Sequence, residues 1–412
     1  MGLTRQILSI TLTKFVDSER SGGFLLLSCA AIALLLTNSA LGAQYLALWQ
    51  TRFMGISIEH WINDGLMAIF FFYIGLELER EIYIGELSSL RDALLPICAA
   101  IGGMAAPALI HLSLNAGSPT QAGFGIPMAT DIAFVLGILA VLGNRIPGSL
   151  KVFVVAYAVM DDLGAIVVIA AFYTTQISAG YLVSALALWA LLIVLNLLFR
   201  VMFIAPYLIG GALMWFLMLK SGVHATIAGV ALAFAIPFSP RDDDQESPSY
   251  KLEAFLHKPV AFIILPFFAL ANAGVVVGSD WVHNVTTSNS IGIMGGLILG
   301  KPLGLVALSL AAVASGLCSL PAGLNWRHVL GAGILGGIGF TMSIFVTNLA
   351  FVGNTDASSA SKMAIFLASL TSGAFGFLCL RFLCGSEAGK SYAEPLALEP
   401  PNRNSVNNRE ES

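Results

Sequence analysis

The chain carries very little charge for its length. Only 11% of its 412 residues are Asp, Glu, Lys or Arg, whereas 57% are hydrophobic. A soluble domain has about 25% charged residues, and a large soluble core would not remove charge from most of a chain this long. The composition therefore excludes an ordinary soluble globular protein.

The motifs of common catalytic and metal sites are also lacking. The five cysteines form no CxxC pair, and the six histidines form neither HExxH nor another zinc spacing. A P-loop, a GxSxG motif and a haem motif are absent as well. We therefore expect no cofactor, no tightly bound metal and no nucleic acid as a partner, and we expect the cysteines to be small buried residues.

Long apolar stretches are what the chain has instead. Several of them, such as residues 152–173 and 329–352, approach the roughly 20 residues with which a helix crosses a bilayer. They do not alternate as the strands of a membrane β-barrel do. The predicted fold class is all-α, a polytopic membrane protein of about twelve transmembrane helices. The predicted spans lie near residues 22–41, 58–83, 93–114, 120–143, 149–175, 180–199, 203–219, 222–238, 253–278, 290–314, 327–351 and 358–384.

The ends of the chain are more polar than its centre. Residues 1–21 are predicted to form a cytoplasmic N-terminal segment and residues 22–384 the twelve-helix transporter domain. The first apolar stretch lacks a clear cleavage pattern, so we expect an uncleaved span and not a signal peptide. Residues 385–412 are polar and contain proline, which predicts a disordered cytoplasmic tail.

The basic residues indicate how the spans are oriented. With twelve spans, every Lys and Arg falls on the side of the termini except Arg52, Lys220 and Lys362 on the other side and Lys301 within the membrane. Basic residues gather on the cytoplasmic side of membrane proteins. The sequence therefore predicts that both termini are cytoplasmic.

Two of the predicted spans are interrupted in their middle. Residues 123–131 and 331–341 are rich in glycine, and a Thr-x-x-x-Phe pattern begins in each at Thr130 and Thr341. Such backbone is tolerated at membrane depth only where it is buried in protein or lines a cavity. A pair of broken spans in matching positions indicates a transporter's binding site, and it predicts that spans 3–5 and 10–12 form an inverted repeat. Close packing of helices through small residues is the alternative.

Asp161 and Asp162 are adjacent in the apolar stretch 152–172. A single acidic side chain at the bilayer centre costs roughly 2.5–3.5 kcal/mol on insertion scales. Neighbours on a helix are about 100° apart, so one carboxylate can face an ion path while the other faces a partner. We predict a site shared by a cation and protons, and hard oxygen ligands favour alkali or alkaline-earth ions. The alternative is a structural pair neutralised by Lys301 or by protonation.

Lys301 and Asp131 are further ionisable residues inside predicted spans. Lys301 either pairs with an aspartate and releases a proton when the ion binds, or neutralises the negative ends of the half-helices. Asp131 is expected to compensate the positive half-helix ends, and Thr130 offers a neutral oxygen beside it. The alternative for Asp131 is a capping residue without a role in transport.

A second set of titratable residues lies at the cytoplasmic ends of two spans. Glu77 and Glu81, and likewise Glu253 and His257, are four residues apart and share a helix face. Histidine changes its charge near neutral pH, so these residues form a candidate pH-response cluster. An ordinary charged helix end is the alternative.

Together these segments resemble the NhaA-type sodium/proton antiporters of bacterial inner membranes. The segments are GLMAIFFFYIGLELERE, IPMATDIAFVLG, VAYAVMDDLGAI, LKSGVHATIAG, ILPFFALANAGV, GKPLG and GGIGFTMSIF, and the resemblance covers nearly all of residues 10–384. It implies crossed broken helices in spans 4 and 11. It also implies a secondary transporter, not an enzyme, in which more protons enter than Na⁺ or Li⁺ ions leave. The expected location is the inner membrane as a multi-pass protein.

The resemblance also implies roles for individual residues. Asp162 and Asp161 would bind Na⁺, Li⁺ and H⁺, transiently for the metal ion. Asp131 and Lys301 would compensate the helix breaks, and Lys301 would pair with Asp161. The pH-response region would contain the cluster Glu77, Glu81, Glu253 and His257. Glu79 stands where a basic residue is expected. The extra negative charge affects the expected pH range of activation, and the expectation of transport is unchanged.

Other functions predict other motifs. A sodium-coupled symporter of an organic solute is the nearest alternative, and the sequence shows no buried arginine that would hold an anionic solute. An intramembrane aspartyl protease needs Tyr-Asp and Gly-x-Gly-Asp motifs, whereas Tyr157 lies four residues before Asp161. A cation channel would not need paired carboxylates with a buried lysine. Charged Arg52 and Glu59 on the outer face are candidates for a homodimer contact.

Overall fold

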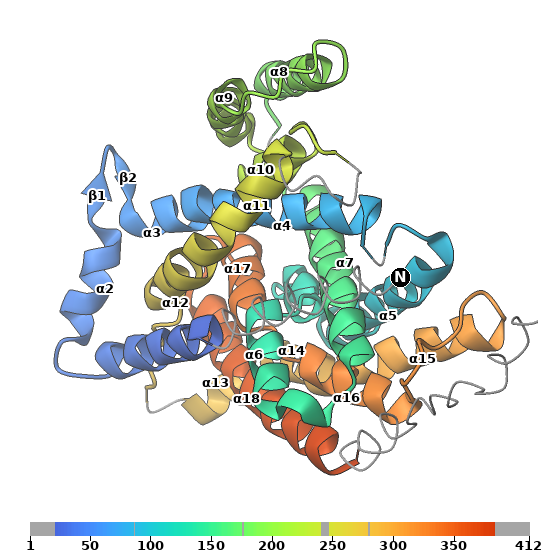
Figure 1. Ribbon diagram of the computed structural model, residues 1–412. Coiled ribbons are helices and arrows are strands. Elements are labelled where there is room, and N and C mark those ends of the chain that lie inside the picture. Colours follow the sequence, from blue (N-terminus) through green and yellow to red (C-terminus); the bar gives the residue numbers. More distant parts are fainter. Residues whose placement is uncertain (1–20, 86, 175–176, 240–246, 279–280, 384–412) are drawn as a thin grey trace, which may run out of the picture.

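The computed structural model describes residues 21–383 with the exception of residues 86, 175–176, 240–246 and 279–280 (Figure 1). The predicted N-terminal segment up to residue 20 and the predicted tail at 385–412 lie outside the described residues. Within the described part, helices account for nearly all regular structure. The exception is an antiparallel hairpin of β1 (Arg52–Phe53) and β2 (Ile56–Ser57). The predicted all-α class is confirmed.

The helices follow the predicted apolar stretches closely. From the N-terminus to the fifth span they are Ser21–Thr37, α2 (Gly42–Gln50), α3 (Ile58–His60), η1 (Trp61–Leu66), α4 (Met67–Tyr83), α5 (Leu90–Asn115), η2 (Gln121–Met128), α6 (Ile132–Leu142), η3 (Gly143–Arg145) and α7 (Gly148–Phe172). The remaining helices are α8 (Ala179–Leu197), α9 (Ala205–Ser221), α10 (Thr226–Ala233), α11 (Pro248–Pro259), η4 (Val260–Ile264), α12 (Leu265–Asn272), α13 (Trp281–Thr286), α14 (Ser288–Gly295), η5 (Gly296–Gly300), α15 (Lys301–Ala314), α16 (Trp326–Gly336), α17 (Phe340–Ala350) and α18 (Thr355–Leu383).

Helix length alone identifies fewer than twelve spans. In the described residues eight helices are long and apolar enough to cross a membrane, or ten when two bent pairs are each counted as one span. The other two predicted spans correspond to α9, which is slightly too short, and α10, which has eight residues. Because α10 rises only about 12 Å, it does not cross an apolar layer of roughly 30 Å by itself.

The first predicted span also differs in shape. Its helix ends at Thr37, and a bend of 115° leads into α2. The first helix of the span predicted near 22–41 thus ends four residues before residue 41, and the chain turns there. Asn38 accounts for part of this turn, because its side chain donates to the Val275 carbonyl at 2.8 Å and accepts from the Val277 backbone N–H at 2.7 Å.

The helices pack as one large apolar core with a smaller cluster beside it. The large core joins residues from most spans, whereas the smaller cluster is formed by α4, α8, α9 and α10. Figure 1 shows α8 and α9 side by side at the edge of the molecule, with α10 between them and α4. Most of α8 is exposed, and its outward side chains are large and apolar. This composition is the one that a lipid-facing helix requires.

The two glycine-rich spans are broken, as predicted. In the fourth, the 3₁₀ helix η2 ends at Met128, and α6 begins only at Ile132. In the eleventh, α16 and α17 meet at 46°, with residues 337–339 between them. Helix α7, which carries Asp161 and Asp162, packs against η2, α6 and α16. The inverted repeat of spans 3–5 and 10–12 stays a prediction.

Candidate functional site

Asp131 lies where the two broken spans meet. Its backbone N–H donates to the Ile338 carbonyl at 2.7 Å, which joins one break to the other. Its carboxylate accepts from the Phe134 backbone N–H at 3.3 Å, and from the Thr341 backbone N–H at 3.0 Å and hydroxyl at 2.5 Å. Phe134 is in the first turn of α6 and Thr341 in that of α17. One negative charge therefore faces the positive N-terminal ends of both second half-helices.

Lys301 is the corresponding positive charge. It is the first residue of α15, follows the π-helical turn η5, and is fully buried. Its Nζ atom donates to the Met128 carbonyl at the C-terminal end of η2 and to Oδ2 of Asp161, the latter at 2.7 Å. The contact with Asp161 and the contact with a negative helix end thus both exist. The structure therefore contains the contacts that each of the two interpretations of Lys301 requires.

The two carboxylates of α7 have different surroundings. Asp161 uses Oδ2 for the ion pair with Lys301, whereas its Oδ1 has no hydrogen-bond partner among the described residues. Neither oxygen of Asp162 has a partner there, although the side chain is only 1% exposed. Buried polar atoms are nearly always hydrogen-bonded, and an unpaired buried carboxylate is costly. Both carboxylate oxygens of Asp162 are thus buried without a hydrogen-bond partner among the described residues.

Thr130 and Tyr157 connect α7 with both broken spans. The Thr130 hydroxyl lies 3.0 Å from the Gly336 carbonyl, at the C-terminal end of α16, and 2.9 Å from the Tyr157 hydroxyl. Sequence reasoning gave Tyr157 no role at the site. The available signal was its position, one helical turn before Asp161 on the same face.

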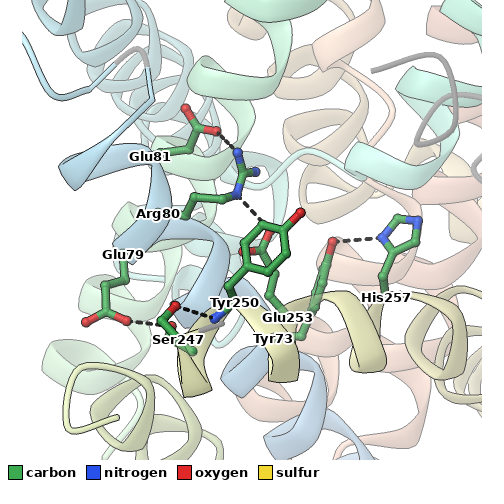
Figure 2. Close-up of polar contacts among 9 residues, drawn as sticks. Tyr73, Glu79, Arg80, Glu81, Ser247, Tyr250, Glu253 and His257 are labelled. Atoms are coloured by element: carbon green, nitrogen blue, oxygen red, sulfur yellow. Dashed lines mark hydrogen bonds and ion pairs between the residues drawn. The ribbon is translucent and has the colours of Figure 1, made fainter. Parts of the chain in front are cut away.

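Two acidic residues of the candidate pH-response cluster contact Arg80 (Figure 2). Arg80 bonds Glu81 at 3.0 Å and Glu253 at 2.8 Å, so it links the end of α4 to α11. Glu81 and Glu253 belong to the predicted cluster, and both contact Arg80, which sequence reasoning gave no role. The available signal was its position between Glu79 and Glu81.

His257 and Glu77 lie deeper on the same two helices. His257 contacts the Tyr73 hydroxyl at 3.0 Å through Nδ1 (Figure 2). Glu77 is 2% exposed, and its Oε1 has no hydrogen-bond partner among the described residues. Tyr73, Glu77 and His257 line a small cavity together with Ile132 and Ala133, which directly follow Asp131. The cavity therefore extends from the candidate pH-response cluster toward the crossing of the broken spans.

Glu79 has a partner that suits its negative charge. The Ser249 hydroxyl donates to its carboxylate at 2.9 Å, and both side chains are buried. Ser249 lies in the first turn of α11, whose N-terminal end is capped by the side chain of Ser247. An acidic side chain is favourable beside a helix N-terminus. This contact explains how the chain accommodates a glutamate where a basic residue was expected.

The chain is similar to known proteins over most of its length. The family described as Na⁺/H⁺ antiporter 1 matches residues 13–380. The Na⁺/H⁺ antiporter NhaA of Dechloromonas aromatica is 64% identical over 382 residues, which are 93% of this chain and 98% of the relative. Na⁺/H⁺ antiporter NhaA 1 of Flavobacterium johnsoniae is 55% identical over 376 residues, which are 91% of this chain and 98% of the relative.

A relative of lower sequence identity matches over a similar share of the chain. Na⁺/H⁺ antiporter NhaA 2 of Pseudomonas syringae is 46% identical over 371 residues, which are 90% of this chain and 94% of the relative. The family match over residues 13–380 includes both broken spans, α7 and the candidate pH-response cluster. With its membrane-spanning helices, crossed breaks and buried carboxylates, the chain belongs to the Na⁺/H⁺ antiporter 1 family, as an NhaA-type multi-pass membrane protein.

Proposed function

We propose that the protein is an electrogenic, pH-regulated antiporter that exports Na⁺ or Li⁺ in exchange for external protons. One observation carries this proposal: two adjacent buried carboxylates differ in their pairing. Asp161 is bound to Lys301, whereas Asp162 has no partner among the described residues. The names of the relatives support exchange of Na⁺ for H⁺.

Exchange follows from competition for the same oxygens. A deprotonated Asp162 attracts a cation, and protonation of the carboxylate removes that attraction. Two carboxylates do not complete the oxygen shell that a hard cation prefers, and within the described residues no group of three or more His, Cys, Asp or Glu is placed to hold a metal ion. The hydroxyl oxygen of Thr130 and the carbonyls freed at the breaks are the neutral donors available nearby.

Asp161 gives the exchange its charge imbalance. To bind the cation through Asp161 as well, the protein must separate that carboxylate from Lys301, and the buried ammonium then loses its counter-charge. Release of one proton from the Lys301 side chain and one from Asp162 per cation bound would move net charge across the membrane. Asp131 stays bound to both helix ends throughout and holds the crossing together.

We further propose that the cytoplasmic cluster sets the pH range of transport. Glu81, Arg80 and Glu253 join α4 to α11, and Glu77 and His257 line the cavity that leads to residues 132 and 133. A change of protonation in this cluster therefore acts on the contact between two spans next to the site. Glu79 adds a negative charge there.

Topology and assembly are part of the same proposal. The distribution of Lys and Arg supports an inner-membrane protein with both termini in the cytoplasm. Arg52 is in β1 and Glu59 is in α3, which directly follows β2. The β1–β2 hairpin projects from the body in Figure 1, and we propose it, with these two residues, as the homodimer contact.

Reconstitution into proteoliposomes tests the function directly. Addition of Na⁺ should dissipate an imposed proton gradient, and this response should be abolished in Asp162→Asn while the variant still inserts and purifies normally. Full exchange in Asp162→Asn would contradict the proposed site. Sodium flux that requires an added organic solute would instead identify a symporter.

A further inference from the structure

Tyr157 is a buried residue with a polar hydroxyl, on the helix that carries the two aspartates. It lies one turn before Asp161 in α7 and is only 1% exposed. Its ring stacks on that of Phe153, with the centroids 6.4 Å apart and the planes at 19°. Its hydroxyl reaches the Thr130 hydroxyl at 2.9 Å, so α7 is tied to the break of the fourth span.

The donors and acceptors in this contact can be assigned. The carbonyl of Gly336 only accepts, so the Thr130 hydroxyl donates its one proton to it across 3.0 Å. The Thr130 oxygen is then an acceptor toward Tyr157, and the Tyr157 hydroxyl is the donor. The hydrogen bonds run from Tyr157 to Thr130 to Gly336, and they connect α7 with both broken spans.

This chain of hydrogen bonds fixes the direction of the Thr130 oxygen. One lone pair accepts from Tyr157, the proton points at Gly336, and the second lone pair remains for another partner. The fit is close, because a Cβ atom at Gly336 would lie 2.6 Å from the Tyr157 hydroxyl oxygen. A glycine at this position is what leaves room for the tyrosine hydroxyl.

We propose that Tyr157 is a positioning residue of the cation site: its hydroxyl orients Thr130 so that the remaining lone pair of that hydroxyl faces the bound ion. This inference rests on the proposed Na⁺/H⁺ exchange and deepens it. Tyr157 acts through Thr130 and does not touch the cation. Removing its hydroxyl should weaken binding of Na⁺ and leave the later steps of transport intact.

Tyr157→Phe removes one oxygen atom and keeps the ring in place. In proteoliposomes at fixed pH we expect the apparent KM for Na⁺ to rise about three- to tenfold, the range that one hydrogen bond supplies, with kcat unchanged within about twofold. Tyr207→Phe is the matched control. Tyr207 is also fully buried and donates to a backbone carbonyl, that of Val201 at 2.9 Å, but it lies on α9 outside the site.

A double-mutant cycle separates positioning from packing. In a Thr130→Ser background, which keeps the hydroxyl, Tyr157→Phe should raise the KM by the same factor. In a Thr130→Val background the change should disappear. If Thr130→Val transports too slowly to assay, the Na⁺ concentration that half-saturates thermal stabilisation of the detergent-purified variants replaces the KM.

The outcomes distinguish the inference from the function on which it rests. Wild-type protein without Na⁺/H⁺ exchange would overturn the proposed function. Normal wild-type exchange with the same KM in Tyr157→Phe and Tyr207→Phe would overturn only the role of Tyr157. An equal rise of KM in the Thr130→Val background would also overturn it, because the tyrosine would then act through packing.

Discussion

The Nζ atom of Lys301 lies 2.7 Å from Oδ2 of Asp161, and both side chains are completely buried. An ion pair at this depth costs desolvation on both sides and is weak evidence for stability by itself. Here the same ammonium also reaches the carbonyl end of η2, so the pair lies between a helix break and the helix that carries the second aspartate. Its position favours a role in transport.

Replacement of Lys301 tests that role. In Lys301→Gln the ion pair is lost, and we expect exchange that no longer generates a membrane potential, because a lysine proton no longer takes part. Breaking a buried pair from one side usually costs about 3–5 kcal/mol, so the thermal midpoint in detergent should fall as well. Oxonol fluorescence in proteoliposomes reports the potential, and a pH-sensitive dye reports the exchange.

Lys301→Arg is the matched variant for charge. Arginine keeps the positive charge but holds its proton firmly, so it should restore the helix-end contact without restoring electrogenic exchange. Electrogenic exchange in Lys301→Gln would show that the lysine only balances the end of η2 and that the transported protons come from the carboxylates.

Asp131 should be more important for stability than an ordinary capping residue. Asp131→Asn keeps the shape of the side chain but removes a charge that faces two helix N-termini, each worth about 0.3–1 kcal/mol. We expect the thermal midpoint of the purified protein to fall by several degrees. Asp356→Asn, in the exposed first turn of α18, is the control and should have little effect. Equal changes in both variants would contradict the double role of Asp131.

Competition between ions makes a quantitative prediction. If a proton and Na⁺ exclude each other at the Asp161–Asp162 pair, the apparent KM for Na⁺ should rise about tenfold for each unit by which the pH falls, as long as one proton competes. Two competing protons would give a steeper rise. Initial rates measured over a range of Na⁺ concentrations at several pH values provide the slope. A KM independent of pH would exclude competition at a common site.

The sequence predicted the parts of this site that break a composition rule. Charged residues in apolar stretches and glycines in mid-span are both exceptional, so Asp161, Lys301 and the two breaks could be found without a structure. The pattern of apolar stretches also located most of the helices. It could not show that Asp131 bonds two helix ends, since Asp131 and Thr341 are far apart in the chain and meet only after the spans cross.

Other features were hidden because they look ordinary in a sequence. Tyr157 is an unremarkable aromatic residue in an apolar helix until its hydroxyl is seen beside Thr130. Arg80 is one of several charges at a helix end, and only the approach of α11 makes it a bridge. Hydropathy likewise gave a full-length eighth span, whereas the chain forms the short α10, because hydropathy reports the apolar stretch and not where the helix ends.

Glu79 is the place where this chain departs from the expected charge pattern. Its carboxylate lies beside Ser249 and the N-terminal end of α11, close to the Glu81–Arg80–Glu253 bridge. Arg80 on α4 thus has acidic neighbours on α4 and α11, and α11 itself carries Lys251, His257 and Lys258. A change of charge at position 79 alters the field on this whole contact.

Glu79→Lys should therefore shift the pH dependence of transport. A positive charge next to the acidic bridge repels protons from it, so we expect the activation profile to move to lower pH by about half a unit to one unit. Glu79→Gln, which only removes the negative charge, should move it in the same direction by less. Ser249→Ala keeps the charge of Glu79 and should leave the profile nearly unchanged, although it removes the hydrogen bond.

Exchange rates measured between pH 6 and 9 distinguish these cases. Control by charge predicts that the activation profile of Glu79→Lys lies at the lowest pH, followed by Glu79→Gln and then by the wild type. A profile that shifts equally in Ser249→Ala and Glu79→Lys would show that the hydrogen bond between α4 and α11, and not the charge, determines the activation pH.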